Sequence, residues 1–187
     1  ETSWTASSSR THYFDQTGDI RVRVEVKDED DEVSTAYLTV TLHWASEYME
    51  ILKNNGVLRG YTGGDLRPDQ AVTRAELLKM AMEAADLSIY GHSFEGIFSD
   101  GDSTDWFDAY VEKGDGYGIV SGYSDGTFRP NDSVNRAEAT KIILETFEVD
   151  FQRYGANLFP DVPQGAWYED YIGTAYTLGL VSGHDDG

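Results

Sequence analysis

The first quarter of the chain contains an alternating hydrophobic pattern. Between residues 19 and 28, the apolar residues Ile20, Val22, Val24 and Val26 alternate strictly with charged ones. This alternation is typical of a half-buried antiparallel strand, and residues 36–42 predict a second strand after an acidic loop at 28–33. Two strands alone are marginally stable, so we expect other strands or a packing partner to complete this hairpin.

From residue 44 onward, the apolar spacing becomes helical. One apolar stripe is formed by Trp44, Tyr48, Ile51 and Leu52. The Asn-Gly pair at residues 55–56 predicts the end of this first helix. A second helix is predicted to begin after Thr73, because Thr73 as N-cap and Glu76 at the third helical position can each accept a hydrogen bond from the other's amide.

This helix-loop-helix unit occurs three times. Trp44 recurs as Trp106 and Trp167, at intervals of 62 and 61 residues. The Gly-Tyr turn, the Arg-Pro pair and the Arg-Ala-Glu helix start of residues 60–76 recur at 122–138, with Asn135 as an equally acceptable N-cap. A fixed interval indicates a repeat architecture in which each copy buries its apolar face against its neighbours. The third copy continues through Gly183 and His184 but lacks the Arg-Pro and Arg-Ala-Glu parts, so we interpret the sequence as a piece of a longer protein.

The second copy has the weakest first helix. It has Lys113, Gly114, Asp115 and Gly116 where the first copy has Ile-Leu-Lys-Asn. Glycine in a helix interior costs backbone entropy, so we expect this helix to be the loosest of the three, and shortened or kinked near Gly114.

Composition narrows the classes of partner. The formal net charge of -20 and a pI near 4.3 argue against nucleic acid and anionic membranes as general partners, since both favour a basic surface. The sequence contains no apolar run long enough to predict a membrane-spanning helix. The absence of cysteine excludes disulfides and thiolate metal sites.

Two regions resemble known families. The Phe-Ser-Asp at 98–100 before Trp106, the segment 118–131 and the Asn-Arg-Ala-Glu at 135–138 resemble a surface-layer homology (SLH) repeat, and the runs within residues 12–42 resemble the closing strands of a PKD-type, immunoglobulin-like β-sandwich. The resemblance implies an α+β multidomain chain in which part of an antiparallel β-sandwich precedes an all-α helical bundle of SLH repeats. The expected domains are 1–43 for the sandwich and 44–95, 96–155 and 156–187 for the repeats, the last truncated.

The SLH resemblance also implies a function. Grooves between such repeats bind a secondary cell-wall polysaccharide or peptidoglycan-linked glycan, commonly pyruvylated, and hold secreted proteins at the bacterial cell surface, cell wall or S-layer. We therefore expect a non-catalytic anchor. Two alternatives stay open: the attachment module of an exoenzyme whose catalytic domain lies outside this chain, or a protein–protein module that joins neighbouring copies in a surface lattice or filament.

Arg74 and Arg136 are the first candidates for contacts with an acidic glycan. A guanidinium meets a carboxylate in a bidentate manner, and both arginines stand at predicted helix N-termini, where exposed amides also favour an anion. The alternative is that both pair with acidic residues of the neighbouring repeat. Glu76 and Glu138 are expected to act in helix capping.

Aromatic and acidic residues complete the candidate site. Trp106 and Trp167 are either sugar-stacking platforms or core anchors, and a tryptophan repeated on an amphipathic stripe favours the core. The remaining candidates are Tyr61 and Tyr123 in the glycine-rich turns and, as hydrogen-bond acceptors, Asp100 and Asp161. Gly60 and Gly122 are expected to provide positive φ.

Catalytic and metal sites are not predicted. Residues 122–126 match Gly-x-Ser-x-Gly, but a nucleophile elbow needs a strand before and a helix after it, and Thr-Phe-Arg-Pro follows here. The four histidines are scattered without metal-ligand spacing. The acidic loops at 28–32 and 100–105 have oxygen ligands that suit Ca²⁺ but not the EF-hand spacing, so solvated loops are favoured.

Overall fold

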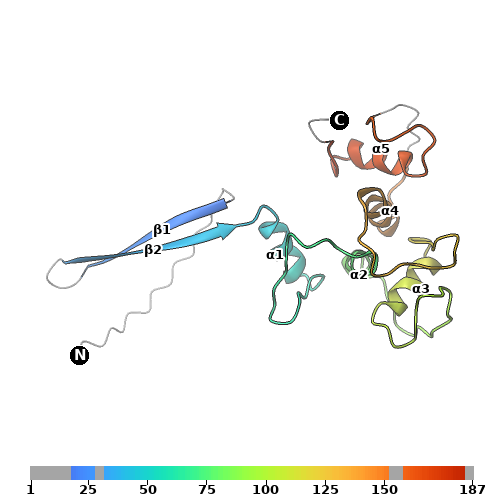
Figure 1. The fold of residues 1–187 in the computed structure, drawn as a ribbon, viewed down its shortest axis with the longest axis horizontal. Helices are drawn as coiled ribbons and strands as arrows, with labels where there is room; N and C mark the ends of the chain where they lie inside the picture. Colours follow the sequence, from blue (N-terminus) through green and yellow to red (C-terminus); the bar gives the residue numbers. More distant parts are fainter. Residues whose placement is uncertain (1–17, 28–31, 152–157, 184–187) are drawn as a thin grey trace. The chain divides into compact units, whose positions relative to one another are not determined.

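The computed structural model describes residues 18–27, 32–151 and 158–183 (Figure 1). The chain divides into two compact units, residues 1–51 and 52–187, which are described separately below. Among the helices described, none is both long and apolar enough to cross a membrane.

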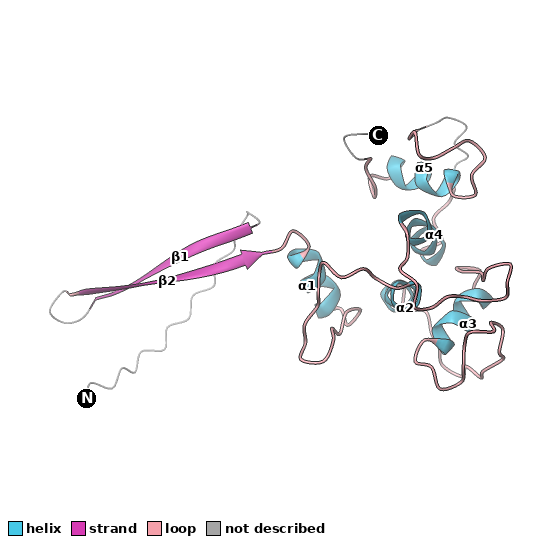
Figure 2. Cartoon of the chain, viewed as in Figure 1, coloured by secondary structure: helices cyan, strands magenta, loops and turns pink. Residues whose placement is uncertain are grey.

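The first unit contains an antiparallel hairpin, drawn as two arrows in Figure 2. Strand β1 is Gly18–Lys27 and strand β2 is Val33–Leu42, so both strand predictions are confirmed, although β2 begins three residues earlier than expected. The register pairs Ile20 with Val40 and Val22 with Leu38, so apolar positions face one another across the hairpin. These two strands are the only ones among the described residues, and the β-sandwich stays a prediction.

Five helices follow the hairpin, in the order that the repeat predicts. Their bounds are Ser46–Asn54 for α1, Arg74–Ala84 for α2, Asp108–Gly116 for α3, Arg136–Thr146 for α4 and Glu169–Thr177 for α5. Helix α2 contacts α3 and α4, and α4 in turn contacts α5 (Figure 1). Each longer helix therefore joins its own repeat to the next one.

The main core lies where α2, α3 and α4 meet. Leu78 and Met82 of α2 are fully buried there with Phe128, and Val111 of α3 and Ile142 of α4 complete the cluster. Burying each large apolar side chain stabilises the fold by about 1.5–3 kcal/mol. The expected stacking of repeats is thus supported by shared side chains.

Helix α3 is not shortened, so that part of the expectation was wrong. It spans nine residues, like α1 and α5. Gly114 is buried, and a Cβ atom at this position would lie 3.1 Å from both Leu78 methyl carbons and 3.2 Å from Val120. The glycine that weakens the isolated helix allows α3 to approach α2 closely.

An equivalent Tyr–Glu pair joins successive repeats at two junctions. The Tyr110 hydroxyl of α3 donates to Glu83 of α2, and the Tyr171 hydroxyl of α5 donates to Glu145 of α4 at 2.5 Å. Burial and the adjacent carboxylate raise the pKa of each tyrosine to about 12. The repeated contact shows that both junctions share one geometry.

Candidate functional site: two grooves at helix N-termini

Capping boxes position both candidate arginines. The Glu76 amide donates to Thr73 Oγ1 at 3.3 Å, and the Thr73 amide donates to Glu76 Oε2 at 2.9 Å. Asn135 and Glu138 make the matching pair of bonds, at 2.9 and 3.1 Å. Both predicted caps are confirmed, and each box places an arginine at the first position of its helix.

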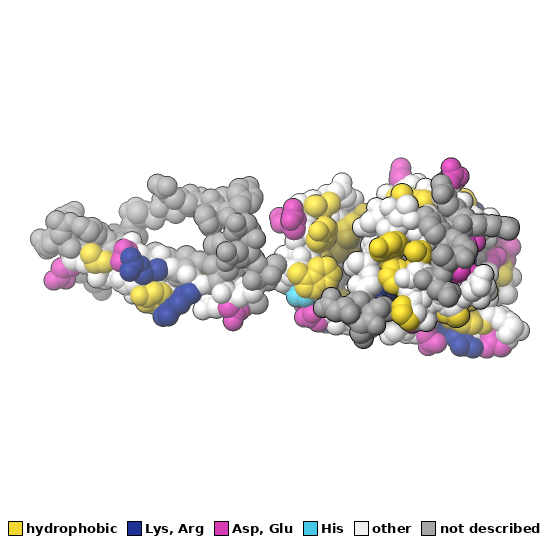
Figure 3. Space-filling model, turned by 90° about the horizontal axis from the view of Figure 1, so that it is seen from above, with side chains coloured by type: hydrophobic (Ala, Val, Ile, Leu, Met, Phe, Trp, Pro, Cys, Tyr) yellow, Lys and Arg dark blue, Asp and Glu magenta, His cyan; other side chains and the backbone are white. Residues whose placement is uncertain are grey.

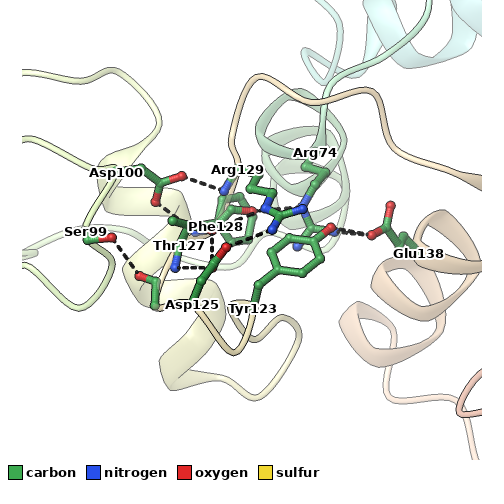
Figure 4. Close-up of polar contacts among 10 residues, drawn as sticks. Arg74, Ser99, Asp100, Tyr123, Asp125, Thr127, Phe128, Arg129 and Glu138 are labelled. Atoms are coloured by element: carbon green, nitrogen blue, oxygen red, sulfur yellow. Dashed lines mark hydrogen bonds and ion pairs between the residues drawn. The ribbon is translucent and has the colours of Figure 1, made fainter.

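Arg74 is buried and paired. Only 5% of the residue is exposed, and its Nη1 lies 2.9 Å from Glu138 Oε1 of the next repeat (Figure 4). Its Nε donates to the Phe128 carbonyl at 3.0 Å, and the guanidinium lies 5.0 Å from the Tyr123 ring centroid. For Arg74 the structure therefore shows the alternative interpretation, pairing with an acidic residue of the neighbouring repeat.

The backbone also closes the N-terminus of α2. The amides of Arg74 and Ala75 donate to the carbonyls of Asp132 and Pro130, at 3.0 and 3.1 Å. The Val134 amide donates to the Val72 carbonyl at 3.0 Å. The helix-end amides that would attract an anion are therefore already bonded to the segment before α4.

The corresponding position in α4 faces a groove. Arg136 is exposed, and its Nη1 donates to the Ser182 carbonyl at 3.2 Å. The groove has a volume of about 370 Å³, and Arg136, Asp161 and Trp167 line it together with Asn135, Ala137, Phe159, Val162, Tyr168, Ile172, Val181, Ser182 and Gly183. Among the described residues, no backbone carbonyl accepts from the Ala137 amide. We call this the α4 groove.

A second groove of about 310 Å³ lies beside it. Its lining includes Arg74, Tyr123, Glu138 and Lys141, and it shares Asn135 and Trp167 with the α4 groove. Lys141 Nζ donates to the Ile119 carbonyl at 2.9 Å, and burial lowers the pKa of this amine. We call it the α2 groove. Of its two cationic side chains, Arg74 is paired with Glu138, whereas no carboxylate of the described residues lies within ion-pair distance of Lys141.

The turn tyrosines are held by their own repeats. Tyr61 donates to Glu76 at 3.0 Å and Tyr123 donates to Glu138 at 2.7 Å. The guanidinium of Arg67 lies 4.1 Å from the Tyr61 ring centroid, and that of Arg129 lies 4.0 Å from the Tyr123 ring centroid. Burial, with the hydrogen bond to Glu138, raises the pKa of Tyr123 above its usual range. Each tyrosine therefore bridges its turn to the capping glutamate.

Asp100 is also used inside the fold. Its two carboxylate oxygens accept from the amides of Phe128 and Arg129, at 2.8 and 2.7 Å (Figure 4). The first repeat has no Phe-Ser-Asp lead-in, and there Asp65 accepts from the Arg67 amide at 3.1 Å. A carboxylate from a different place in the sequence thus holds the same turn.

The repeated tryptophans are not core residues, contrary to the favoured interpretation. Trp106 is 53% exposed and Trp167 is 56% exposed. Trp106 lies near Lys79, whose Nζ is 5.5 Å from the indole centroid, and Trp167 packs edge-on against Tyr168 and Tyr171. Apolar side chains remain at the surface of the molecule, as the yellow areas of Figure 3 show for one face.

The two turn glycines serve different needs. Gly60 has a φ angle of +72°, as expected, and this is a backbone conformation that glycine adopts readily and other residues rarely do. Gly122 is not among the glycines with positive φ, so that expectation was wrong. A Cβ atom at Gly122 would lie 2.3 Å from the Phe98 ring, and close packing is therefore what requires glycine there.

One of the two acidic loops with possible Ca²⁺ ligands, at residues 100–105, lies in the described part of the chain. Residues 28–31 lie outside the described part of the chain. In the other loop, Asp102 accepts from the Thr104 amide at 2.9 Å, while Asp105 accepts from the Asp102 amide at 3.0 Å. These bonds account for an ordinary turn.

Sequence reasoning missed one cluster. His92 Nε2 lies 3.0 Å from Asp108 Oδ2 and 3.5 Å from Glu112 Oε2. Only the i, i+4 spacing of Asp108 and Glu112 on α3 is visible in the sequence, because His92 comes from the loop after α2.

Similar proteins carry the same kind of sequence within much longer chains. The amylopullulanase of Thermoanaerobacterium thermosulfurigenes is 33% identical over 147 residues, which cover 75% of this chain and 8% of that protein. The cellulosome-anchoring protein of Acetivibrio thermocellus is 30% identical over 139 residues, which cover 68% of this chain and 29% of that protein. The surface layer protein of Brevibacillus choshinensis is 30% identical over 130 residues, which cover 68% of this chain and 11% of that protein.

These relatives imply an extracellular protein associated with the cell envelope. The chain spans less than a third of the length of each of the three. The family model of the S-layer homology domain matches residues 37–78, 97–140 and 158–187. The chain therefore belongs to the S-layer homology domain family, whose non-catalytic domains anchor surface proteins and enzymes to the cell wall.

Proposed function

We propose that this chain is an anchoring module that binds a secondary cell-wall polysaccharide through the α4 groove. The observation that carries the proposal is the contrast between the two arginines. Arg136 is exposed at a groove, whereas Arg74 is buried against a carboxylate. The α4 groove therefore has an exposed guanidinium in its lining, which an anionic ligand can reach.

The groove has the groups that an acidic sugar needs. The guanidinium of Arg136 offers a bidentate partner for a carboxylate such as a pyruvyl ketal, and the Ala137 amide at the helix N-terminus adds a donor. Trp167 provides a flat apolar face for the C–H side of a sugar ring, and exposed Asp161 provides an acceptor for its hydroxyls. The volume of about 370 Å³ falls within the usual range for ligand sites.

The negative charge of the chain does not oppose this recognition. Surface charges act over a screening length of about 8 Å at physiological salt, so a net charge of -20 spread over the whole protein has little effect in a groove lined by Arg136. Affinity is then set by local groups.

The other candidate residues take structural roles in this proposal. We assign Arg74, Tyr61, Tyr123 and Asp100 to holding the turns and the contact between repeats, because their polar atoms bond to groups of those turns or of the neighbouring repeat. Trp106 offers a stacking face at the junction of α2 and α3.

The proposal extends to the organisation of the longer protein. We propose that residues 1–43 belong to a PKD-type spacer and that residues 44–95, 96–155 and 156–187 are three SLH repeats arranged in a helical bundle. The amylopullulanase relative favours a second candidate, in which this module attaches an exoenzyme whose catalytic domain lies elsewhere. An assay of the full-length protein on polysaccharides distinguishes the two.

A cell-wall pull-down tests the proposal. Wild type, Arg136→Ala and Arg23→Ala are incubated with sacculi before and after chemical removal of the secondary polymer. Arg23 is a matched control because it is an exposed arginine of the hairpin, paired with Glu25 at 3.2 Å. We expect polymer-dependent binding that Arg136→Ala abolishes and Arg23→Ala retains. Binding that survives both polymer removal and Arg136→Ala contradicts the proposal and favours the lattice-assembly alternative.

A further inference from the structure

One cluster of side chains is not used by either groove. His92, from the loop that leaves α2, meets Asp108 and Glu112, which lie one turn apart on α3. Both acidic residues are buried, and one ligand atom from each of the three residues lies within 4.8 Å of the other two. Within the described residues, no other group of this kind was found.

We propose that His92, Asp108 and Glu112 bind a divalent metal ion of the zinc class. Zinc takes histidine nitrogen and carboxylate oxygen at about 2.0–2.2 Å, so two ligand atoms of a tetrahedral site are about 3.4 Å apart. Two of the observed separations, 3.0 and 3.5 Å, bracket this value. Three protein ligands leave a fourth position for water, as in other zinc sites with an open position.

Backbone amides hold one of the proposed ligands, the Glu112 carboxylate, in place. The amides of Glu95 and Ile97 donate to its two oxygens at 2.9 and 3.0 Å and hold its orientation, as outer-shell partners of metal ligands do.

The histidine ligand has to exchange one partner for another. When a metal binds, the imidazole Nε2 lone pair would face the ion, and the hydrogen bond to Asp108 would be replaced by shared coordination.

The repeat architecture does not require this cluster. At the positions of Asp108 and Glu112, the first repeat has Ser46 and Glu50, and the third has Glu169 and Gly173. The pair Asp108 and Glu112 occurs in the second repeat alone, although all three repeats form the corresponding helix, and His92 comes from the segment that leads into that repeat. A local function at this place explains the set better than a general packing need.

The competing interpretation is a metal-free hydrogen-bonded anchor for the loop of residues 87–98. Both interpretations make the cluster stabilising, but only the proposal makes its stability depend on metal. Titration calorimetry of the whole chain, stripped with a chelator and titrated with ZnCl₂, distinguishes them. The variants are His92→Gln and Asp108→Asn, with His43→Gln as the matched histidine control.

We expect one saturable Zn²⁺ site per chain and a rise in melting temperature on adding ZnCl₂. Each cluster variant should weaken binding by at least about tenfold, since even outer-shell changes cost that much, while His43→Gln should bind like wild type. Co²⁺ should give the absorption of a four-coordinate N/O site, lost in His92→Gln. Equal Zn²⁺ affinity in His92→Gln and wild type, the absence of a saturable site, or displacement of Zn²⁺ by equimolar Ca²⁺ would each overturn the proposal. Circular dichroism confirms that each variant is folded, and Asp108→Asn serves alone if His92→Gln is not.

Discussion

The two grooves begin from nearly identical sequence and differ in what their arginines meet. Arg74 and Arg136 each follow a confirmed N-cap and precede Ala-Glu. Arg74 lies against Glu138 and the Phe128 carbonyl, whereas Arg136 lies at the α4 groove and donates to the Ser182 carbonyl.

This difference shows that one motif can place its arginine in two environments. The capping box determines where the helix begins, and the neighbouring repeat determines whether the arginine is buried against a carboxylate or exposed at a groove. In this protein the same residue type therefore holds repeats together at one junction and, by our proposal, binds glycan at the next.

The largest effect should come from breaking the buried pair. Arg74→Met leaves the Glu138 carboxylate, whose side chain is only 14% exposed, without its cation, and we expect unfolding to become easier by about 3–5 kcal/mol. The matched Arg136→Met should change stability by no more than about 0.5 kcal/mol. Urea unfolding measures both, and equal losses in the two variants would show that the grooves do not differ in this way.

A second test concerns the turn that supports Arg74. Gly122→Ala would bring a Cβ atom within 2.8 Å of the Thr127 carbonyl and 2.3 Å of the Phe98 ring. Overpacking of this kind costs about 1–3 kcal/mol, and Phe128, whose carbonyl accepts from Arg74, lies in the same turn.

The control for this test is Gly116→Ala, which has open space around the Cβ position and no positive φ. Its stability should equal or slightly exceed that of wild type, because alanine favours a helix more than glycine does. A thermal melt in which both alanine variants behave alike would contradict the role of close packing at Gly122.

Local features of the fold could be predicted from sequence. The strands follow from strict alternation, and the starts of α2 and α4 follow from caps whose partners are three residues apart. These signals act over a few residues, so neighbouring parts of the chain do not overrule them.

Features that depend on distant residues could not be predicted. The partner of Arg74 is 64 positions away in the sequence, and nothing local distinguishes Arg74 from Arg136. The burial of Gly114 depends on Leu78, and the exposure of Trp167 depends on the grooves beside it. The His92 cluster likewise needs a loop to fold back onto α3.

A smaller change tests the geometry of the α4 groove. Arg136→Lys keeps the positive charge but loses the planar pair of donors, so we expect polymer binding to weaken about tenfold, equivalent to about 1.4 kcal/mol. Lys141→Arg, in the α2 groove, is the matched change in the opposite direction. Quantitative sacculus binding that is insensitive to Arg136→Lys would indicate a simple charge contact.

The smallest effect should appear as a pH dependence on the α2 side of the comparison. Hydrogen bonds from the Thr127 hydroxyl and from Arg129, together with the Thr127 amide, lower the pKa of Asp125 to about 2 (Figure 4). Arg129 in turn packs on Tyr123, which lines the α2 groove. In the unfolded chain the pKa of an aspartate is about 3.9.

Because the folded pKa is the lower one, Asp125 stabilises the fold above about pH 4, and this contribution is lost as the pH falls toward about 2. Urea midpoints of wild type and Asp125→Asn should therefore converge across this window, with wild type the more stable at pH 5. Many other carboxylates titrate there in both proteins, so the difference between the two curves is the quantity to measure. Parallel curves would mean that the turn of residues 123–129 holds Arg129 without help from the Asp125 charge.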